Sequence, residues 1–129
     1  MKLVADENIV GLDCLPGDVD VITAPGRAID RELLRDADAL WVRSVTPVTA
    51  ELVGDSPLRF VGTATAGVEH VDREALAEGG IRFAAAPGAN AMAVVEYVLA
   101  ALLQQREPWE RLEAGGALGI VGQIGRAHV

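Results

Sequence analysis

Residues 36–46, DADALWVRSVT, carry the pattern that decides the fold: an apolar run over residues 39–42 that ends in a polar turn. The run does not alternate between apolar and polar positions, which is typical of a strand buried on both faces. The same arrangement recurs along the chain. We expect strands over residues 2–5, 19–24, 39–42, 59–62 and 81–85.

Short helices are expected between these strands, because Asp30, Thr49 and Asp72 are suitable N-cap residues. A longer helix is expected over residues 91–105, capped by Asn90. Strands that alternate with helices predict a parallel sheet with helices on both faces, and right-handed crossovers leave few topologies. We therefore predict an α/β fold with a flavodoxin-like parallel sheet.

The end of the chain has a different pattern. A sixth strand is expected at residues 118–121, followed by the glycines Gly122 and Gly125. This resembles the start of a Rossmann domain, where a G-x-G-x-x-G turn binds a dinucleotide, but here the turn lacks one glycine or is shortened. We predict a flavodoxin-like domain over residues 1–105. Residues 106–129 are predicted to be a linker and the first strand and turn of an incomplete NAD-binding domain.

The bulk composition is that of a globular protein. The 129 residues are 50% hydrophobic and 23% charged, with a net charge of −8. An acidic chain is not expected to bind nucleic acid or an anionic membrane surface, since both require basic patches. The single cysteine, Cys14, excludes an internal disulfide and is expected to be a small buried residue. The longest apolar stretch is too short to span a bilayer.

A ligand site is expected at the carboxyl ends of the parallel strands, near the point where strand order reverses. Several hydrogen-bond donors follow these strands, namely Arg43, Ser44, Thr46, Thr63 and Thr65. A guanidinium, hydroxyl groups and a glycine at position 67 suit a carboxylate or a phosphate. The alternative is that these small residues only turn the chain and cap helices. His70 follows the same segment, where a structural role is expected, and no residue spacing indicates a metal site.

Five segments together resemble one known family. They are VADEN (4–8), PGRAID (25–30), DADALWVRSVT (36–46), RFVGTATAGVEHVD (59–72) and AAPGANAMAVVEYVLAALL (85–103). These segments are similar to the D-isomer-specific 2-hydroxyacid dehydrogenases. The resemblance is most specific to the members that oxidise 4-phospho-D-erythronate at its 2-hydroxyl, by hydride transfer to NAD, in pyridoxal phosphate biosynthesis.

The resemblance implies that the flavodoxin-like domain binds substrate, with contacts from Ser44 and Thr65 and from the backbone at Ala66 and Gly67. Arg43 is a further candidate contact with a small anionic sugar acid. Gly122 and Gly125 are the candidate contacts with NAD. The resemblance also implies a cytoplasmic homodimer.

Other family features are absent from the chain or altered in it. The family's catalytic residues would lie beyond residue 129, so no catalytic residue is assigned, and the chain is expected to be an inactive N-terminal portion. The family usually has TAGTDH at residues 65–70, where Val68 lacks a hydroxyl and Glu69 keeps the charge. The competing hypothesis is a free-standing flavodoxin-like module that binds a small phosphorylated acid.

Overall fold

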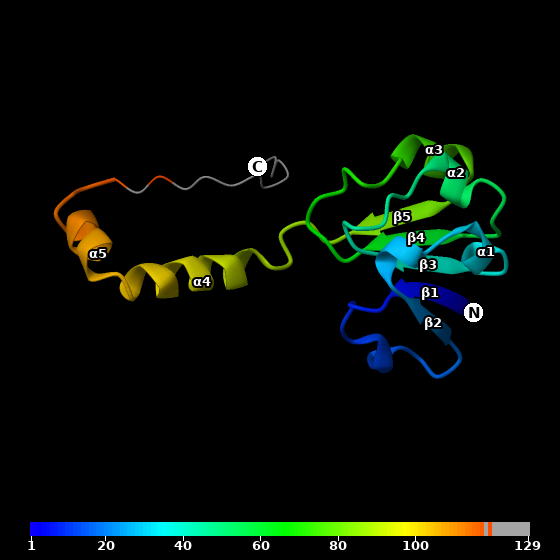
Figure 1. Ribbon diagram of the computed structural model, residues 1–129, viewed down its shortest axis with the longest axis horizontal. Helices are drawn as coiled ribbons and strands as arrows, with labels where there is room; N and C mark the ends of the chain where they lie inside the picture. Colours follow the sequence, from blue (N-terminus) through cyan, green and yellow to red (C-terminus); the bar gives the residue numbers. More distant parts are fainter. Residues whose placement is uncertain (118, 120–129) are drawn as a thin grey trace. The chain divides into compact units, whose positions relative to one another are not determined.

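The computed structural model of the chain describes residues 1–117 and residue 119, in two compact units (Figure 1). One unit is Met1–Ala86 and the other begins at Pro87. The first unit is built on a five-stranded parallel sheet in the order β2-β1-β3-β4-β5. Its strands are β1 (Lys2–Asp6), β2 (Asp20–Ala24), β3 (Ala39–Val42), β4 (Phe60–Thr63) and β5 (Arg82–Ala85).

The strand order confirms the predicted flavodoxin-like sheet, because 2-1-3-4-5 is the order of that fold. Each strand forms where a short apolar run was expected, within one residue at either end. The sixth strand expected at residues 118–121 lies outside the described residues, as do Gly122 and Gly125.

Short helices connect the strands of this unit. They are the 3-10 helices η1 (Leu12–Cys14) and η2 (Gly26–Ala28) and the α-helices α1 (Arg31–Leu34), α2 (Ala50–Val53) and α3 (Arg73–Glu78). The predicted caps of the three α-helices are confirmed. Asp30, Thr49 and Asp72 each accept a hydrogen bond from the backbone N–H three residues later, at 3.0, 3.2 and 3.0 Å.

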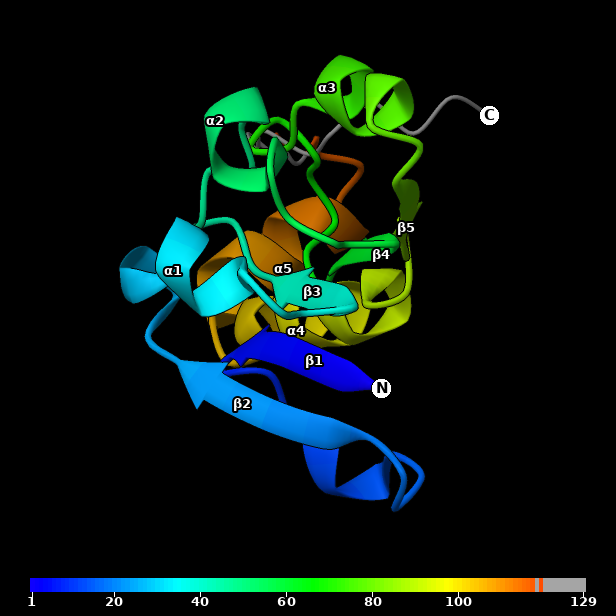
Figure 2. The same ribbon diagram turned by 90° about the vertical axis from the view of Figure 1, so that its right-hand side faces the viewer.

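The three α-helices of this unit all pack on the same face of the sheet (Figure 2), so the expectation of helices on both faces is wrong for them. Strand order explains the difference. The chain moves across the sheet in one direction from β2 to β3, β4 and β5, and right-handed crossovers then place α1, α2 and α3 on one side. Only the step from β1 to β2 runs the other way, and its connection contains η1.

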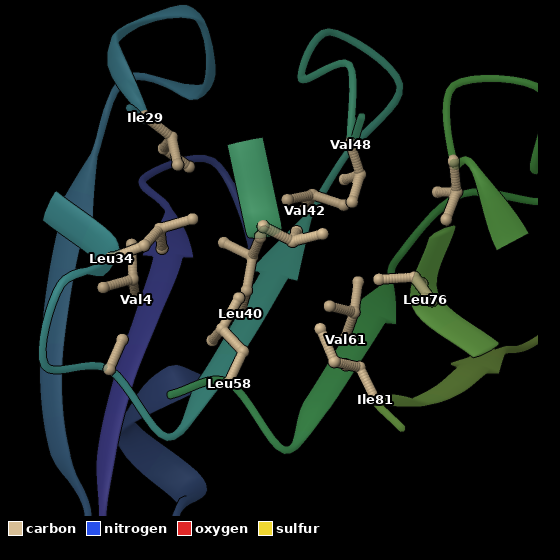
Figure 3. Packing of buried hydrophobic residues seen from close by; sticks show 13 residues of the cluster. Val4, Ile29, Leu34, Leu40, Val42, Val48, Leu58, Val61, Leu76 and Ile81 are labelled. Atoms are coloured by element: carbon tan, nitrogen blue, oxygen red, sulfur yellow. The ribbon is translucent and has the colours of Figure 1, made fainter. Parts of the chain in front are cut away.

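The main core lies between the sheet and these helices. Figure 3 shows Leu34 of α1 and Leu76 of α3 packing toward Val4, Leu40 and Val61 of the strands. All five side chains are at most 1% exposed. Burial of each such side chain stabilises the fold by roughly 1.5–3 kcal/mol. The helices are thereby fixed against the sheet, and the loops between strands and helices leave the sheet at defined positions.

The opposite face has a smaller core of Leu3, Ala5 and Ala39. Leu12 and Leu15 from the η1 segment pack against it. Cys14 lies in the same segment but is exposed, so the expectation that it is buried is wrong. The neighbouring leucines supply the apolar contacts of this segment.

The second unit contains α4 (Ala91–Leu103) and α5 (Arg106–Glu113). Asn90 stands at the N-cap position of α4 but makes no side-chain capping hydrogen bond. Residues 106–113, which belong to the predicted linker, form the helix α5. Pro108 is tolerated there because the first turn of a helix needs no backbone N–H donor. The first compact unit ends at Ala86, before α4 begins. The assignment of α4 to the flavodoxin-like domain over residues 1–105 remains a prediction.

Candidate functional site

The loops after β3 and β4 leave the sheet from neighbouring strand ends. Val42 pairs with Thr63 in the parallel ladder, and the N–H of Ala64 donates to the carbonyl of Val42 at 2.9 Å. The loops meet again farther along, where Val48 and Val71 form a parallel bridge. The two loops are therefore held together at both of their ends.

This arrangement places the predicted substrate-binding residues on two adjoining loops. Arg43 and Ser44 begin the first loop, and Thr65, Ala66 and Gly67 lie on the second. Ser44 and Ala66 are exposed, while the other three are half-buried. Among the described residues, the Arg43 side chain makes no ion pair or hydrogen bond. Its guanidinium is thus available to an anion. A substrate-binding role for these five residues remains a prediction.

Thr46 belongs to a different group of contacts, at the point where the strand order reverses. Its hydroxyl is buried and donates to the carbonyl of Gly26 at 2.9 Å. A Cβ added to Gly26 would lie 2.9 Å from the Thr46 hydroxyl and would also collide with Oδ2 of Asp6. Asp6, Gly26 and Thr46, which come from the ends of β1, β2 and β3, therefore fill the space between these strands.

Asp6, the last residue of β1, is fully buried. Its Oδ1 accepts from the backbone N–H of Asn8 at 2.8 Å and from the Asn8 side chain at 3.2 Å. Its Oδ2 has no hydrogen-bond partner among the described residues. Glu7 is exposed, so the two carboxylates point apart and do not form an acid/base pair. The position of this aspartate at the end of a buried apolar strand is the sequence feature that could have indicated its burial.

A second group joins Thr63, Thr65 and His70 on the β4 loop. The Thr63 hydroxyl lies 3.0 Å from Nε2 of His70 and 2.9 Å from the Thr65 hydroxyl. The Thr65 hydroxyl donates to the carbonyl of Gly67 at 3.1 Å. Burial lowers the pKa of His70 below its usual value, and the nearby Glu69 carboxylate partly opposes this shift. The imidazole is therefore neutral near pH 7.

Two hollows of the surface are not lined by any of the five predicted substrate-binding residues. One of about 580 Å³ lies between α1, α2 and the loops that precede them. Another, of about 560 Å³, lies at the amino edge of the strands and is lined by Met1, Asp38, Ala39, Arg59, Phe60 and Arg82. Neither hollow is lined by Ser44 or Thr65.

Within residues 1–117, no group of three or more His, Cys, Asp and Glu side chains is placed to hold a metal ion. No helix in that part is both long enough and apolar enough to cross a bilayer.

The fold and the loop motifs together define a class of protein. Residues 4–121 match the family model described as "D-isomer specific 2-hydroxyacid dehydrogenase, catalytic domain". This match spans most of the sequence. The chain therefore belongs to the D-isomer-specific 2-hydroxyacid dehydrogenase family.

Within the family, the similar curated proteins carry one particular name. The chain is 56% identical over 103 residues to the erythronate-4-phosphate dehydrogenase of Teredinibacter turnerae, which covers 79% of the chain and 28% of that relative. It is 48% identical over 128 residues to the erythronate-4-phosphate dehydrogenase of Pseudomonas savastanoi, which covers 97% of the chain and 34% of that relative. The chain thus spans about a third of the length of these relatives.

Solved structures agree on the fold. One is a putative D-isomer specific 2-hydroxyacid dehydrogenase from Polaromonas, which matches 95% of the chain and 42% of its own length. The TM-score is 0.69 at 18% sequence identity. At this level of identity the likeness supports the fold and carries no information on the substrate.

Proposed function

We propose that the chain is the substrate-binding portion of an NAD-dependent dehydrogenase that oxidises the 2-hydroxyl of 4-phospho-D-erythronate. The observation that carries the proposal is the pairing of the Arg43–Ser44 loop with the Thr65–Gly67 loop at the carboxyl edge of β3 and β4. The names of the relatives at 48 and 56% identity support the choice of substrate.

The chemistry of these loops suits a phosphorylated hydroxy acid. Such a substrate carries a carboxylate and a phosphate, and a chain with a net charge of −8 must attract them through local donors. The Arg43 guanidinium offers a planar fork of N–H donors without a competing ion pair in the described residues. The Ser44 hydroxyl and the backbone N–H groups of Ala66 and Gly67 complete the donor set.

The proposal includes NAD as the cofactor, but it does not rest on the geometry of an NAD site. When bound, NAD would supply the acceptor for the hydride that leaves the carbon bearing the 2-hydroxyl. Gly122 and Gly125, the candidate NAD contacts, lie outside the described residues, and no step depends on their placement. We further propose that the parent enzyme acts in pyridoxal phosphate biosynthesis, in the cytoplasm and as a homodimer.

A calorimetric titration of the chain with 4-phospho-D-erythronate tests the proposal. Arg43→Met should weaken binding by roughly ten- to a hundredfold, because a hydrogen bond to a charged group contributes about 1.5–3 kcal/mol. Arg82→Met is the matched control, since it removes the same charge from the exposed amino end of β5. We expect it to change the affinity less than twofold.

The results that contradict the proposal are equally clear. If the unmodified chain gives no heat at millimolar ligand, it does not bind this substrate. If both arginine variants weaken binding equally, the anion is attracted by overall charge and not by the β3 loop.

A second candidate function is a free-standing module that binds a small phosphorylated acid. Its support is that all five candidate residues lie within the compact unit Met1–Ala86. A titration of a protein that extends through the predicted NAD-binding domain, with NAD present, separates the two functions. A free-standing module would bind the acid and ignore NAD. The dehydrogenase hypothesis predicts that the extended protein binds both the acid and NAD, and that it reduces NAD.

A further inference from the structure

The hydrogen bonds around Thr63 determine where its proton goes. A threonine hydroxyl has one proton to donate and two lone pairs to accept with. Thr65 uses its proton on the carbonyl of Gly67, at 3.1 Å. In the 2.9 Å contact between the two hydroxyls, Thr63 must therefore donate and Thr65 must accept.

The same reasoning extends to His70. Since the Thr63 proton points to Thr65, the Thr63 oxygen can only accept from Nε2 of His70, 3.0 Å away. Nε2 must then carry a hydrogen. The Thr63 oxygen also accepts from the N–H of Thr65 at 3.4 Å, so both of its lone pairs are used. This is consistent with its environment, because Thr63 is only 4% exposed and a buried hydroxyl requires partners.

The result is a chain of hydrogen bonds that all run in one direction, from His70 to Thr63 to Thr65 to the carbonyl of Gly67. We call this chain the relay. Any other tautomer or direction loses at least one of the three contacts. Hydrogen bonds aligned in this way strengthen one another. The backbone of His70 adds a second anchor, because its carbonyl accepts from the N–H of Val48 at 2.7 Å and so contacts the β3 loop.

Thr65 is left with a single free hydrogen-bonding function. Its proton is used on Gly67, one lone pair accepts from Thr63, and its other lone pair has no partner among the described residues. Thr65 is half-buried, so a ligand can reach it. In this state it cannot donate to a carboxylate or phosphate oxygen, but it can accept from a ligand hydroxyl.

We infer that His70, in its Nε2–H tautomer, positions the Thr65 hydroxyl through Thr63 so that Thr65 recognises a hydroxyl group of the ligand. The inference deepens the proposed function. Its second part, the recognition of a ligand hydroxyl (the ligand half), rests on that function, whereas the direction of the hydrogen bonds does not. The residues of the site then have different roles. Arg43 and the backbone donors bind the anionic groups of the ligand, and Thr65 selects acids that carry a hydroxyl. His70 acts as a positioning residue and does not touch the ligand.

The tautomer can be tested without any ligand. Long-range proton–nitrogen NMR of the ¹⁵N-labelled chain at pH 7.5 distinguishes a protonated Nε2 from a protonated Nδ1. The sequence has two histidines, His70 and His128, and His70→Gln assigns the signals. We expect the His70 Nε2–H form alone. A dominant Nδ1–H form, or a mixture in exchange, would overturn the relay.

The ligand half is tested with two probes, 4-phospho-D-erythronate and 4-phosphooxybutanoate, which lacks both hydroxyls. His70→Leu removes the donor and should weaken binding of the hydroxylated acid about three- to tenfold, the effect of one neutral hydrogen bond. Binding of the deoxy acid should stay unchanged. His70→Gln retains an N–H donor at the same reach and should restore most of the affinity.

Thr63→Val provides a second route if His70→Leu does not fold, because valine keeps the volume of threonine without its hydroxyl. It should show the same selectivity, and Thr63→Ser should behave like the unmodified chain. An equal loss for both probes would mean a merely structural role and overturn the inference. If the unmodified chain binds neither probe, the proposed function and the ligand half fail, while the NMR result still decides the relay.

Discussion

The hydroxyl of Thr46 donates a 2.9 Å hydrogen bond to the backbone carbonyl of Gly26, and both residues are buried. The bond connects the loop after β3 to the loop after β2, across the end of β1. Asp6, at that end, packs against the same glycine. The gap at which the strand order reverses is therefore closed by the protein's own side chains. The candidate site lies one strand farther along, between β3 and β4.

Thr46→Val should lower the free energy of unfolding by about 1–3 kcal/mol, because it leaves the buried carbonyl of Gly26 without a donor. Thr46→Ser keeps the hydroxyl and should lose much less. Urea unfolding of the chain followed by circular dichroism gives both values. Equal stability of the valine variant and the unmodified chain would show that the bond does not hold the loop.

Gly26→Ala should destabilise the chain by about 1–3 kcal/mol or more, the usual effect of overpacking a tight site. The new Cβ would collide with Asp6 and lie 2.8 Å from Cγ2 of Val45. Gly17→Ala is the control, because a Cβ there would meet nothing within 4 Å. Urea midpoints should fall for the first variant only. A fall of similar size for both would assign the effect to the backbone instead of to the packing.

Acidification should weaken the fold through His70. Burial lowers the pKa of His70, so below about pH 6.5 the unfolded chain takes up a proton more readily than the folded chain. This contribution to the free energy of unfolding is intact above pH 6.5 and is lost as the pH falls through the lowered value. His70→Gln should reduce the difference between urea midpoints at pH 7.5 and 5.5. An unchanged difference would exclude His70 as its source.

Asp72→Ala should cost about 1 kcal/mol, since the side chain caps α3 by accepting from the N–H of Ala75 at 3.0 Å. Asp72→Asn is the matched variant, because an asparagine oxygen can accept the same bond. Thermal unfolding should place it close to the unmodified chain. If the asparagine variant is as unstable as the alanine variant, charge and not capping is the source of the stabilisation.

Much of the fold could be predicted from the sequence because its signals are local. A strand buried on both faces needs a short apolar run, and a helix start needs an oxygen-bearing side chain such as Asp30 or Thr49. The loops that carry Arg43, Ser44 and Thr65 could be placed because carboxyl ends of parallel strands share one edge. The helix α5 was not predicted, because a proline such as Pro108 usually ends a helix and is tolerated only in the first turn, where it stands here.

The roles of polar side chains could not be predicted in this way. Thr46 and Thr65 look alike in the sequence, yet one is buried in a bond to Gly26 and the other lies half-buried on a loop. Asp6 is a charged residue at a strand end in the sequence, yet in the structure it is fully buried and packs against Gly26. His70 was expected to be structural, and only its distance to Thr63 revealed the relay.

The parallel sheet and its helix caps could be read from the sequence, because they follow from periodicity and from short-range hydrogen bonding, and the edge at which a ligand binds remains a prediction. Tertiary structure alone decided which donors remain free. Gly26 and Thr46, 20 residues apart, meet only after their strands have packed into one sheet, and Thr63 meets His70 only after the loop that follows β4 has folded back on itself. Each hydroxyl has one proton, and its folded neighbours decide whether a ligand can receive it.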